Sequence, residues 1–283
     1  MSGEAEGKRA AIAALDEAYA NAKHIPGGAA YPARWEAAAA AFRAAAGARW
    51  REQRFGAGPA DWFDLFLPAG RPAGLIVFIH GGYWHLFGPR SFSHLAAGGV
   101  GAGLAVAMPC YPLAPAARIA AITAHVARAV AAVAAVPEAA GLPVAITGHS
   151  AGGHLAARMA CAGVLPEALA ARVAAVVPVS PLSDLGPLVR TSMNATLGID
   201  AAEVMEESPA FLLNDPAIPV HVWVGGDERP AFLDQARWLA EAWEVPLTIE
   251  PGRHHFDVIE GLERADSPLM RAVAGWCPSV GHP

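Results

Sequence analysis

Apolar runs that alternate with helical segments are the feature that most restricts how this chain can fold. Six short runs are almost continuously apolar, the pattern of strands buried on both faces. They span residues 74–79, 104–108, 143–147, 173–177, 220–224 and 246–249. Helical patterns separate them at residues 117–136, 151–162, 229–243 and 266–276. This alternation predicts an α/β fold, with a mostly parallel central sheet and helices on both faces.

Two parts of the chain lie outside this alternation. Residues 1–48 carry two helical patterns around a Pro-Gly-Gly breaker and predict a helical N-terminal arm. Two short strands are expected after this arm, near residues 50–55 and 62–67. Residues 181–218 hold short helical pieces punctuated by proline and no strand, which predicts a small helical cap. We therefore expect one domain over residues 1–283.

Composition excludes several classes of protein. Hydrophobic residues make up 54% of the chain and charged residues 16%, which excludes a disordered protein. A net charge of −6 gives no basic surface for nucleic acid or an anionic membrane. Three widely spaced cysteines predict free thiols, and the N-terminus has no apolar signal core, so we expect a cytoplasmic protein. The apolar content is also compatible with a homodimer.

The sharpest local motif is G-H-S-A-G-G at residues 148–153, between a predicted buried strand and a predicted helix. Such a turn holds its central residue in strained geometry and projects the Ser150 hydroxyl above the carboxyl edge of the sheet. The helix that follows aims its first N–H groups at any anion formed there. The motif predicts Ser150 as a nucleophile, with a purely structural turn as the alternative.

A second motif, H-G-G-Y-W at residues 80–84, directly follows a predicted strand. Gly81 and Gly82 let the backbone turn inward and point N–H donors at a substrate oxygen, and the N–H of Ala151 would complete an oxyanion hole. His80 could be mistaken for a catalytic base. We favour a structural role, in which its imidazole holds the loop in shape.

A serine nucleophile needs a base, and the base needs a carboxylate to orient it. In the chain order serine, acid, histidine, each partner follows a later strand. Asp227, after the fifth apolar run, is the preferred acid, with Glu228 and Asp184 as alternatives. After the sixth run, His254 and His255 compete for the base, and spacing alone does not decide between them.

Nothing in the sequence indicates a metal or a cofactor. It contains no HExxH motif, no Cys/His cluster at zinc spacing and no GxxxxGK loop. The Gly-rich residues 98–103 precede a strand instead of following one, which disfavours a nucleotide site. His149 and His154 are expected to pack or to form hydrogen bonds within the core.

The motifs together resemble those of α/β-hydrolases, and specifically the kynurenine formamidase (arylformamidase) family of HGGxW esterases. The resemblance extends over about residues 49–269 and implies the α/β-hydrolase fold. It is carried by residues 80–84, 111–115, 148–153, 180–194, 197–200 and 255–260. In that family the catalytic histidine directly precedes an aromatic residue, which implies His255 as the base. Ala116 departs from the glutamate that related hydrolases often carry after the Y-x-L-x-P segment.

The resemblance implies hydrolysis of an aryl formamide, N-formyl-L-kynurenine, to L-kynurenine and formate. Trp84 and Tyr111 are candidates to stack on the substrate ring, and Arg190 and Asn194 of the cap are candidates to bind its charged groups. Alternatively, Arg190 is a solvated surface charge and Asn194 a helix cap. The competing functions are a broad carboxylesterase for short acyl esters and a non-catalytic binding module with the same fold.

Overall fold

An eight-stranded sheet organises the computed structural model, which describes residues 2–277. The strands are β1 (Trp50–Arg54), β2 (Trp62–Phe66), β3 (Leu75–Ile79), β4 (Ala105–Pro109), β5 (Val144–His149), β6 (Val173–Val179), β7 (Val222–Gly225) and β8 (Leu247–Glu250). Their order is β1-β2-β4-β3-β5-β6-β7-β8, with β2 antiparallel to both neighbours and all other neighbours parallel. The predicted mostly parallel sheet is confirmed. Residues 278–283, part of the expected domain, lie outside the described residues.

Strand β3 illustrates why uninterrupted apolar runs form the centre of the sheet. All five of its residues are buried. Leu75, Val77 and Ile79 pack into the core on one face of the sheet, whereas Ile76 and Phe78 pack into the core on the other. Successive side chains of a strand point to opposite faces, and burying each one contributes roughly 1.5–3 kcal/mol. Both faces therefore require a covering layer.

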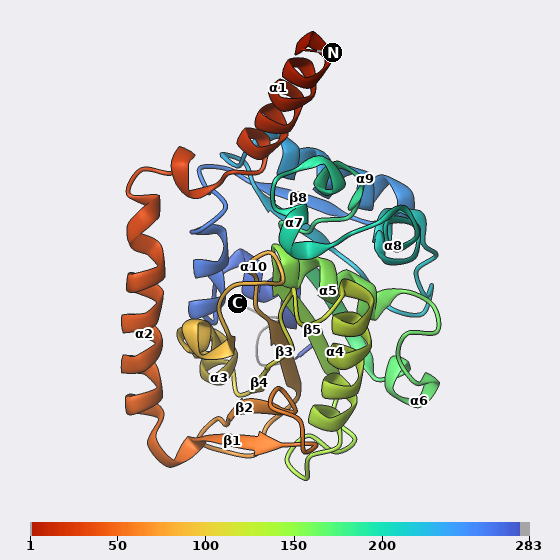
Figure 1. The fold of residues 1–283 in the computed structure, drawn as a ribbon. Coiled ribbons are helices and arrows are strands. Elements are labelled where there is room, and N and C mark those ends of the chain that lie inside the picture. The colour runs from red at the N-terminus through yellow and green to blue at the C-terminus, as the bar shows by residue number, and fades with distance from the viewer. Residues whose placement is uncertain (1, 278–283) are drawn as a thin grey trace.

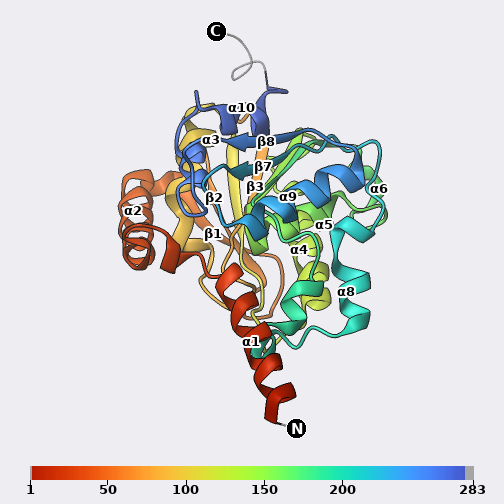
Figure 2. The ribbon, with the colours of Figure 1, turned by 90° about the horizontal axis from the view of Figure 1, so that it is seen from above.

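Helices supply this cover on each face (Figures 1 and 2). One layer consists of α4 (Ile119–Ala134), α5 (Ala151–Ala160) and α9 (Pro230–Trp243). The other consists of α2 (Tyr31–Ala46), α3 (Ala97–Gly101), α10 (Pro268–Ala274) and the 3-10 segments Pro89–Ala96 and Val258–Glu263. A short helix, α6 (Glu167–Ala170), precedes β6. The long helices agree with the sequence pattern, whereas Gly-rich α3 carries no such pattern.

The N-terminal arm is helical, as predicted, and its two helices lie differently. Helix α1 (Ser2–Ala18) projects away from the body, and α2 runs along its side (Figures 1 and 2). The 3-10 turns Ala22–His24 and Gly28–Ala30 join them, and Gly47–Arg49 leads into β1. Trp35 of α2 packs against the rings of Phe87 and Phe256, at centroid distances of 6.0 and 5.2 Å. These contacts fix the arm on the loops that follow β3 and β8.

The predicted cap is also present and carries no strand between residues 181 and 218. It contains α7 (Asn194–Leu197), α8 (Ala201–Glu207) and the 3-10 turns Gly186–Arg190 and Pro209–Phe211. The Glu207 carboxylate accepts hydrogen bonds from Arg158 Nε at 3.0 Å and Thr123 Oγ1 at 2.6 Å. Since the Arg158 and Glu207 side chains are only 10% and 6% exposed, this buried ion pair ties the cap to α5.

Two further observations concern the helices and the cysteines of the described residues. Within residues 2–277 the helices are all too short or too polar to span a membrane. The same residues contain no disulfide, although Cys110, Cys161 and Cys277 all lie among them. The homodimer stays a prediction.

Replacing Arg158 by methionine leaves the Glu207 carboxylate buried without its cation. We expect the free energy of unfolding in urea to fall by about 3 kcal/mol, because water cannot reach the carboxylate to replace the guanidinium. The control is Arg237→Met, which breaks the exposed ion pair of Arg237 with Asp234 and is expected to cost less than about 1 kcal/mol. Equal small losses in both variants would contradict the anchoring role of Arg158.

Candidate active site

Ser150 lies at the sharp turn between β5 and α5, as the motif predicted. Its backbone angles are φ 58° and ψ −118°, a region that residues with a Cβ rarely adopt. Its N–H donates to the Val179 carbonyl, and its own carbonyl accepts from the His154 N–H, both at 2.9 Å. A methyl group on Gly152 would lie 2.0 Å from the Ile79 carbonyl oxygen, so the turn closes only with glycine there. The turn presents the serine side chain at the carboxyl edge of the sheet.

The Gly-Gly loop after β3 packs directly against this turn. A Cβ on Gly81 would lie 3.2 Å from Ser150 Cβ, and Gly82 has a φ of +111° that glycine tolerates. The backbone N–H groups of Gly81, Gly82 and Ala151 have no hydrogen-bond acceptor among residues 2–277. Three free donors beside a serine hydroxyl are the groups that an oxyanion would need.

His80 takes the structural position that the sequence analysis favoured. Its Nδ1 lies 2.8 Å from the Gly81 carbonyl oxygen, and the Tyr111 hydroxyl donates to the His80 carbonyl at 2.8 Å. The His80 and Tyr111 rings stack with centroids 4.2 Å apart. Burial lowers the pKa of His80 to about 4, so the ring is neutral at neutral pH. The loop that carries Gly81 and Gly82 is therefore held by an uncharged imidazole.

His255 is held by a buried carboxylate. Its Nδ1 lies 2.6 Å from Glu228 Oε2, and the Glu228 side chain is fully buried. The second oxygen, Oε1, accepts from the Gly225 N–H at 2.9 Å and from the Ser180 hydroxyl. The His255 ring lies against Phe232, at a centroid distance of 4.2 Å. Because Nδ1 is engaged, Nε2 is the nitrogen left to exchange a proton in the cavity that His255 and Ser150 both line.

The preference for Asp227 as the orienting acid was wrong. Asp227 is exposed, its N–H donates to the Arg253 carbonyl at 2.9 Å, and Glu228 occupies the place beside His255. The other alternative, Asp184, accepts from the Gly186 N–H at 2.7 Å and does not approach His255. Adjacent acidic residues in a turn point in different directions, and residue spacing carries no information about which one faces inward.

The neighbouring histidine, His254, contacts its own loop and the N-terminal arm. Its Nε2 lies 3.3 Å from the Tyr31 hydroxyl of α2, and its Nδ1 lies 3.2 Å from the backbone nitrogens of Phe256 and Asp257. All three of these contacts are with the loop or with α2, and none is with Glu228. The structure thus distinguishes the two histidines that sequence spacing left open.

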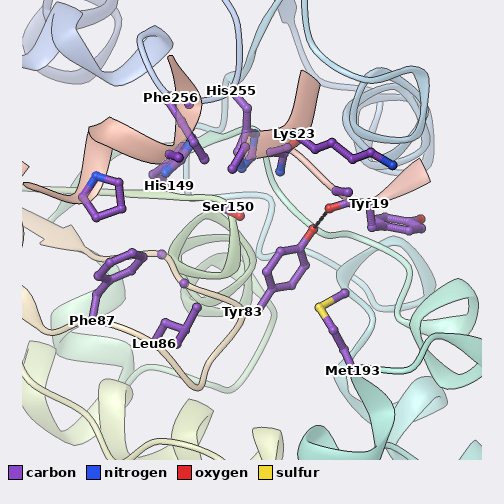
Figure 3. Close-up of a pocket in the computed structure, with 18 of the residues that line it drawn as sticks. Tyr19, Lys23, Tyr83, Leu86, Phe87, His149, Ser150, Met193, His255 and Phe256 are labelled. Carbon is purple, nitrogen blue, oxygen red and sulfur yellow. Dashed lines mark hydrogen bonds between the residues drawn. The ribbon is translucent and has the colours of Figure 1, made fainter. Parts of the chain in front are cut away.

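A cavity of about 540 Å³ lies over Ser150, within the usual range for small-molecule sites. Leu86 and Phe87 lie on one side of Ser150, and Tyr19, Lys23 and Met193 on the other (Figure 3). The Tyr83 hydroxyl donates to the Tyr19 carbonyl at 2.7 Å and so connects the Gly-Gly loop to the arm. Among residues 2–277, no group of three or more His, Cys, Asp or Glu side chains is placed to hold a metal.

Trp84 and Tyr111, predicted to stack on a substrate ring, do not line this cavity. Trp84 is completely buried, with its ring edge-on to His154 at a centroid distance of 5.0 Å. Tyr111 is 2% exposed and bonded to His80. Both expectations were wrong because aromatic residues near a glycine loop can pack against the loop itself as readily as they can contact a ligand. Tyr83, one residue earlier than Trp84, does line the cavity.

Arg190 and Asn194 are also not where the predicted substrate contacts required them. Arg190 is exposed and lies beside α1, in a separate depression. The Asn194 amide donates to the carbonyls of Val189 and Ile199, at 3.0 and 2.9 Å, and accepts from the Ile199 N–H at 2.7 Å. It closes a turn within the cap. The cavity instead takes Asp16, Asn21 and Lys23 from the N-terminal arm, in which we identified no functional motif.

Several known proteins that are similar to this chain in sequence or structure are hydrolases. A family model for the alpha/beta hydrolase fold matches residues 76–214. Kynurenine formamidases of Salmo salar and Danio rerio are each 26% identical, over 77% and 74% of this chain and 79% and 75% of their own. A putative thioesterase from a Silicibacter species is 52% identical, with a TM-score of 0.88 over 92% of this chain and 98% of its own. A Pyrobaculum calidifontis esterase, 19% identical, shares the fold with a TM-score of 0.66 over 86% and 90%.

Replacing Glu228 by glutamine is expected to lower kcat by roughly 10⁴-fold, because the amide holds His255 in the wrong tautomer. The measurement is hydrolysis of p-nitrophenyl acetate, with Ser150→Ala as the blank. The matched control is Asp227→Asn, which removes the neighbouring carboxylate and should leave kcat within about twofold of the unsubstituted protein. A larger loss in Asp227→Asn than in Glu228→Gln would contradict the assignment.

The buried His80 makes stability depend on pH. Its pKa is about 4 in the folded protein and 6.5 when unperturbed, so between these values the unfolded chain binds more protons. The free energy of unfolding should therefore fall as the pH drops from about 6.5 to about 4. His80→Asn keeps a donor for the Gly81 carbonyl but cannot titrate, so urea titrations over this range should show a weaker pH dependence. An unchanged dependence would show that His80 is not buried in its neutral form.

Proposed function

Since the chain belongs to the α/β-hydrolase superfamily and resembles the kynurenine formamidases, we propose that it is a serine hydrolase with Ser150, His255 and Glu228 as its triad. The observation that carries this proposal is the 2.6 Å contact between His255 Nδ1 and the buried Glu228 carboxylate, at the cavity that contains the strained Ser150. A nucleophile, a base and an orienting acid in this relation perform acyl transfer on many folds.

The reaction begins when His255 Nε2 removes the Ser150 proton as the hydroxyl oxygen attacks the substrate carbonyl. The tetrahedral oxyanion accepts hydrogen bonds from the N–H groups of Gly81, Gly82 and Ala151, each worth roughly 3 kcal/mol of the barrier. The His255 imidazolium then protonates the leaving group, and its charge is balanced by Glu228. Water attacks the acyl-enzyme by the same steps and frees Ser150.

The substrate we propose is an aryl formamide, N-formyl-L-kynurenine, which yields L-kynurenine and formate. An aryl amine leaves more readily than an alkyl amine because its lone pair is delocalised into the ring, and a formyl carbon is unhindered. Support comes from the two formamidase relatives and from the aromatic side chains of Trp35, Tyr83, Phe87 and Phe256 around the cavity, which suit an aryl ring.

A second candidate is hydrolysis of an uncharged ester or thioester. The largely apolar side chains around Ser150, such as Leu86 and Met193, favour it because a neutral acyl chain needs no charged partner. The description of the Silicibacter protein as a thioesterase points in the same direction. The triad and the oxyanion donors are common to both candidates, so substrate preference distinguishes them.

The deciding measurement is kcat/KM for N-formyl-L-kynurenine beside that for p-nitrophenyl acetate and a short-chain acyl thioester. An aryl formamidase should prefer the formamide on the order of tenfold or more, because its site fits that leaving group in the transition state. Ser150→Ala should abolish turnover of all three. Efficient ester or thioester cleavage with negligible formamide cleavage would reject the proposed substrate and retain the triad.

A further inference from the structure

One short segment of the arm brings three polar side chains to the cavity. Asp16, near the end of α1, and Asn21 and Lys23, in the turn that follows, all line the cavity. Lys23 lies on the same side of Ser150 as Tyr19 and Met193, opposite Leu86 and Phe87 (Figure 3). The arm therefore brings both signs of charge and an amide to the cavity, whereas Leu86 and Phe87 are apolar.

Asn21 is the buried member of this group. Its side chain lines the cavity, the residue is only 7% exposed, and its Oδ1 has no hydrogen-bond partner within residues 2–277. Asn21 also makes no side-chain capping bond to the 3-10 turn that it precedes. Buried amide oxygens are nearly always hydrogen-bonded in folded proteins, so one left open in a cavity wall suits a ligand that brings a donor.

Lys23 and Asp16 provide the two charges. Lys23 Nζ lies 2.6 Å from Glu17, but the two side chains are 67% and 41% exposed, and such surface pairs exchange partners at little cost. Asp16 Oδ1 accepts from the Ser192 N–H at 2.8 Å, which fixes its carboxylate between the arm and the cap. Its second oxygen can still accept a hydrogen bond.

We propose that Asp16, Asn21 and Lys23 form an arm subsite that binds an α-amino-acid head group. The substrate carboxylate pairs with Lys23 Nζ, and its ammonium group donates to Asn21 Oδ1 and to the Asp16 carboxylate. The aryl formamide then lies between this subsite and Ser150. The inference rests on the proposed function and assigns to the arm the zwitterion recognition that Arg190 and Asn194 do not provide.

The test compares two aryl formamides that share the reacting group. One is N-formyl-L-kynurenine, and the other carries an acetyl group in place of its amino-acid chain. In Lys23→Met, the ratio of kcat/KM for the first to that for the second should fall roughly tenfold, mainly through KM. Asn21→Leu should lower the same ratio, and Lys23→Arg should largely restore it. Arg237→Met removes an exposed arginine ion-paired on α9 and should leave the ratio unchanged.

A second measurement separates failure of the subsite from failure of the proposed function. Binding of L-kynurenine and of kynuramine, which lacks the carboxylate, is measured on Ser150→Ala by tryptophan fluorescence. The subsite predicts tighter binding of L-kynurenine, with the difference lost in Lys23→Met/Ser150→Ala. If formamides are cleaved but Lys23→Met does not change the ratio, the subsite is wrong and the function stands. If no formamide is cleaved, the proposed formamidase function is wrong. Equal binding of L-kynurenine and kynuramine would overturn the subsite as well.

Discussion

The contact between Glu228 and His255 is the interaction on which the organisation of the site depends. It joins the loop after β7 to the loop after β8, and the Ser180 hydroxyl brings the end of β6 to the same carboxylate. No lysine or arginine pairs with Glu228 among residues 2–277. Its charge is stabilised by a backbone N–H, a hydroxyl and an imidazole, which is sufficient for a buried carboxylate only if all three stay in place. The geometry of three strand ends is therefore tied to one side chain.

The sequence predicted best those features that depend on local pattern. The strands at the centre of the sheet were predictable because a run such as residues 75–79, buried on both faces, tolerates no polar residue. The turn at Ser150 was predictable because only glycine fits where Gly152 meets the Ile79 carbonyl. The buried strands and the turn both depend on short-range constraints, which determine the residue type at each position.

Features that depend on side-chain direction could not be predicted in the same way. Asp227 and Glu228 are equivalent in spacing, and the turn alone decides that Glu228 faces His255. Trp84 and Tyr83 are adjacent aromatics, of which one packs into the core and the other faces the cavity. The contribution of the arm to the cavity was missed because residues 16–23 are far along the chain from every catalytic motif. Nothing in their pattern marks them as more than the end of a helix.

The position of the arm in the chain separates it from the strands that carry the reactive groups. Its chain enters the sheet only at β1, the edge strand farthest from β8, whereas Ser150, Glu228 and His255 follow β5, β7 and β8. The arm segment that lines the cavity, residues 16–23, therefore precedes every strand of the sheet. Substitutions at Asp16, Asn21 or Lys23 change the polarity of that segment without replacing a residue of the strand ends that hold the reactive groups. In evolutionary terms, selectivity and chemistry are encoded in separate parts of the gene and can diverge at different rates.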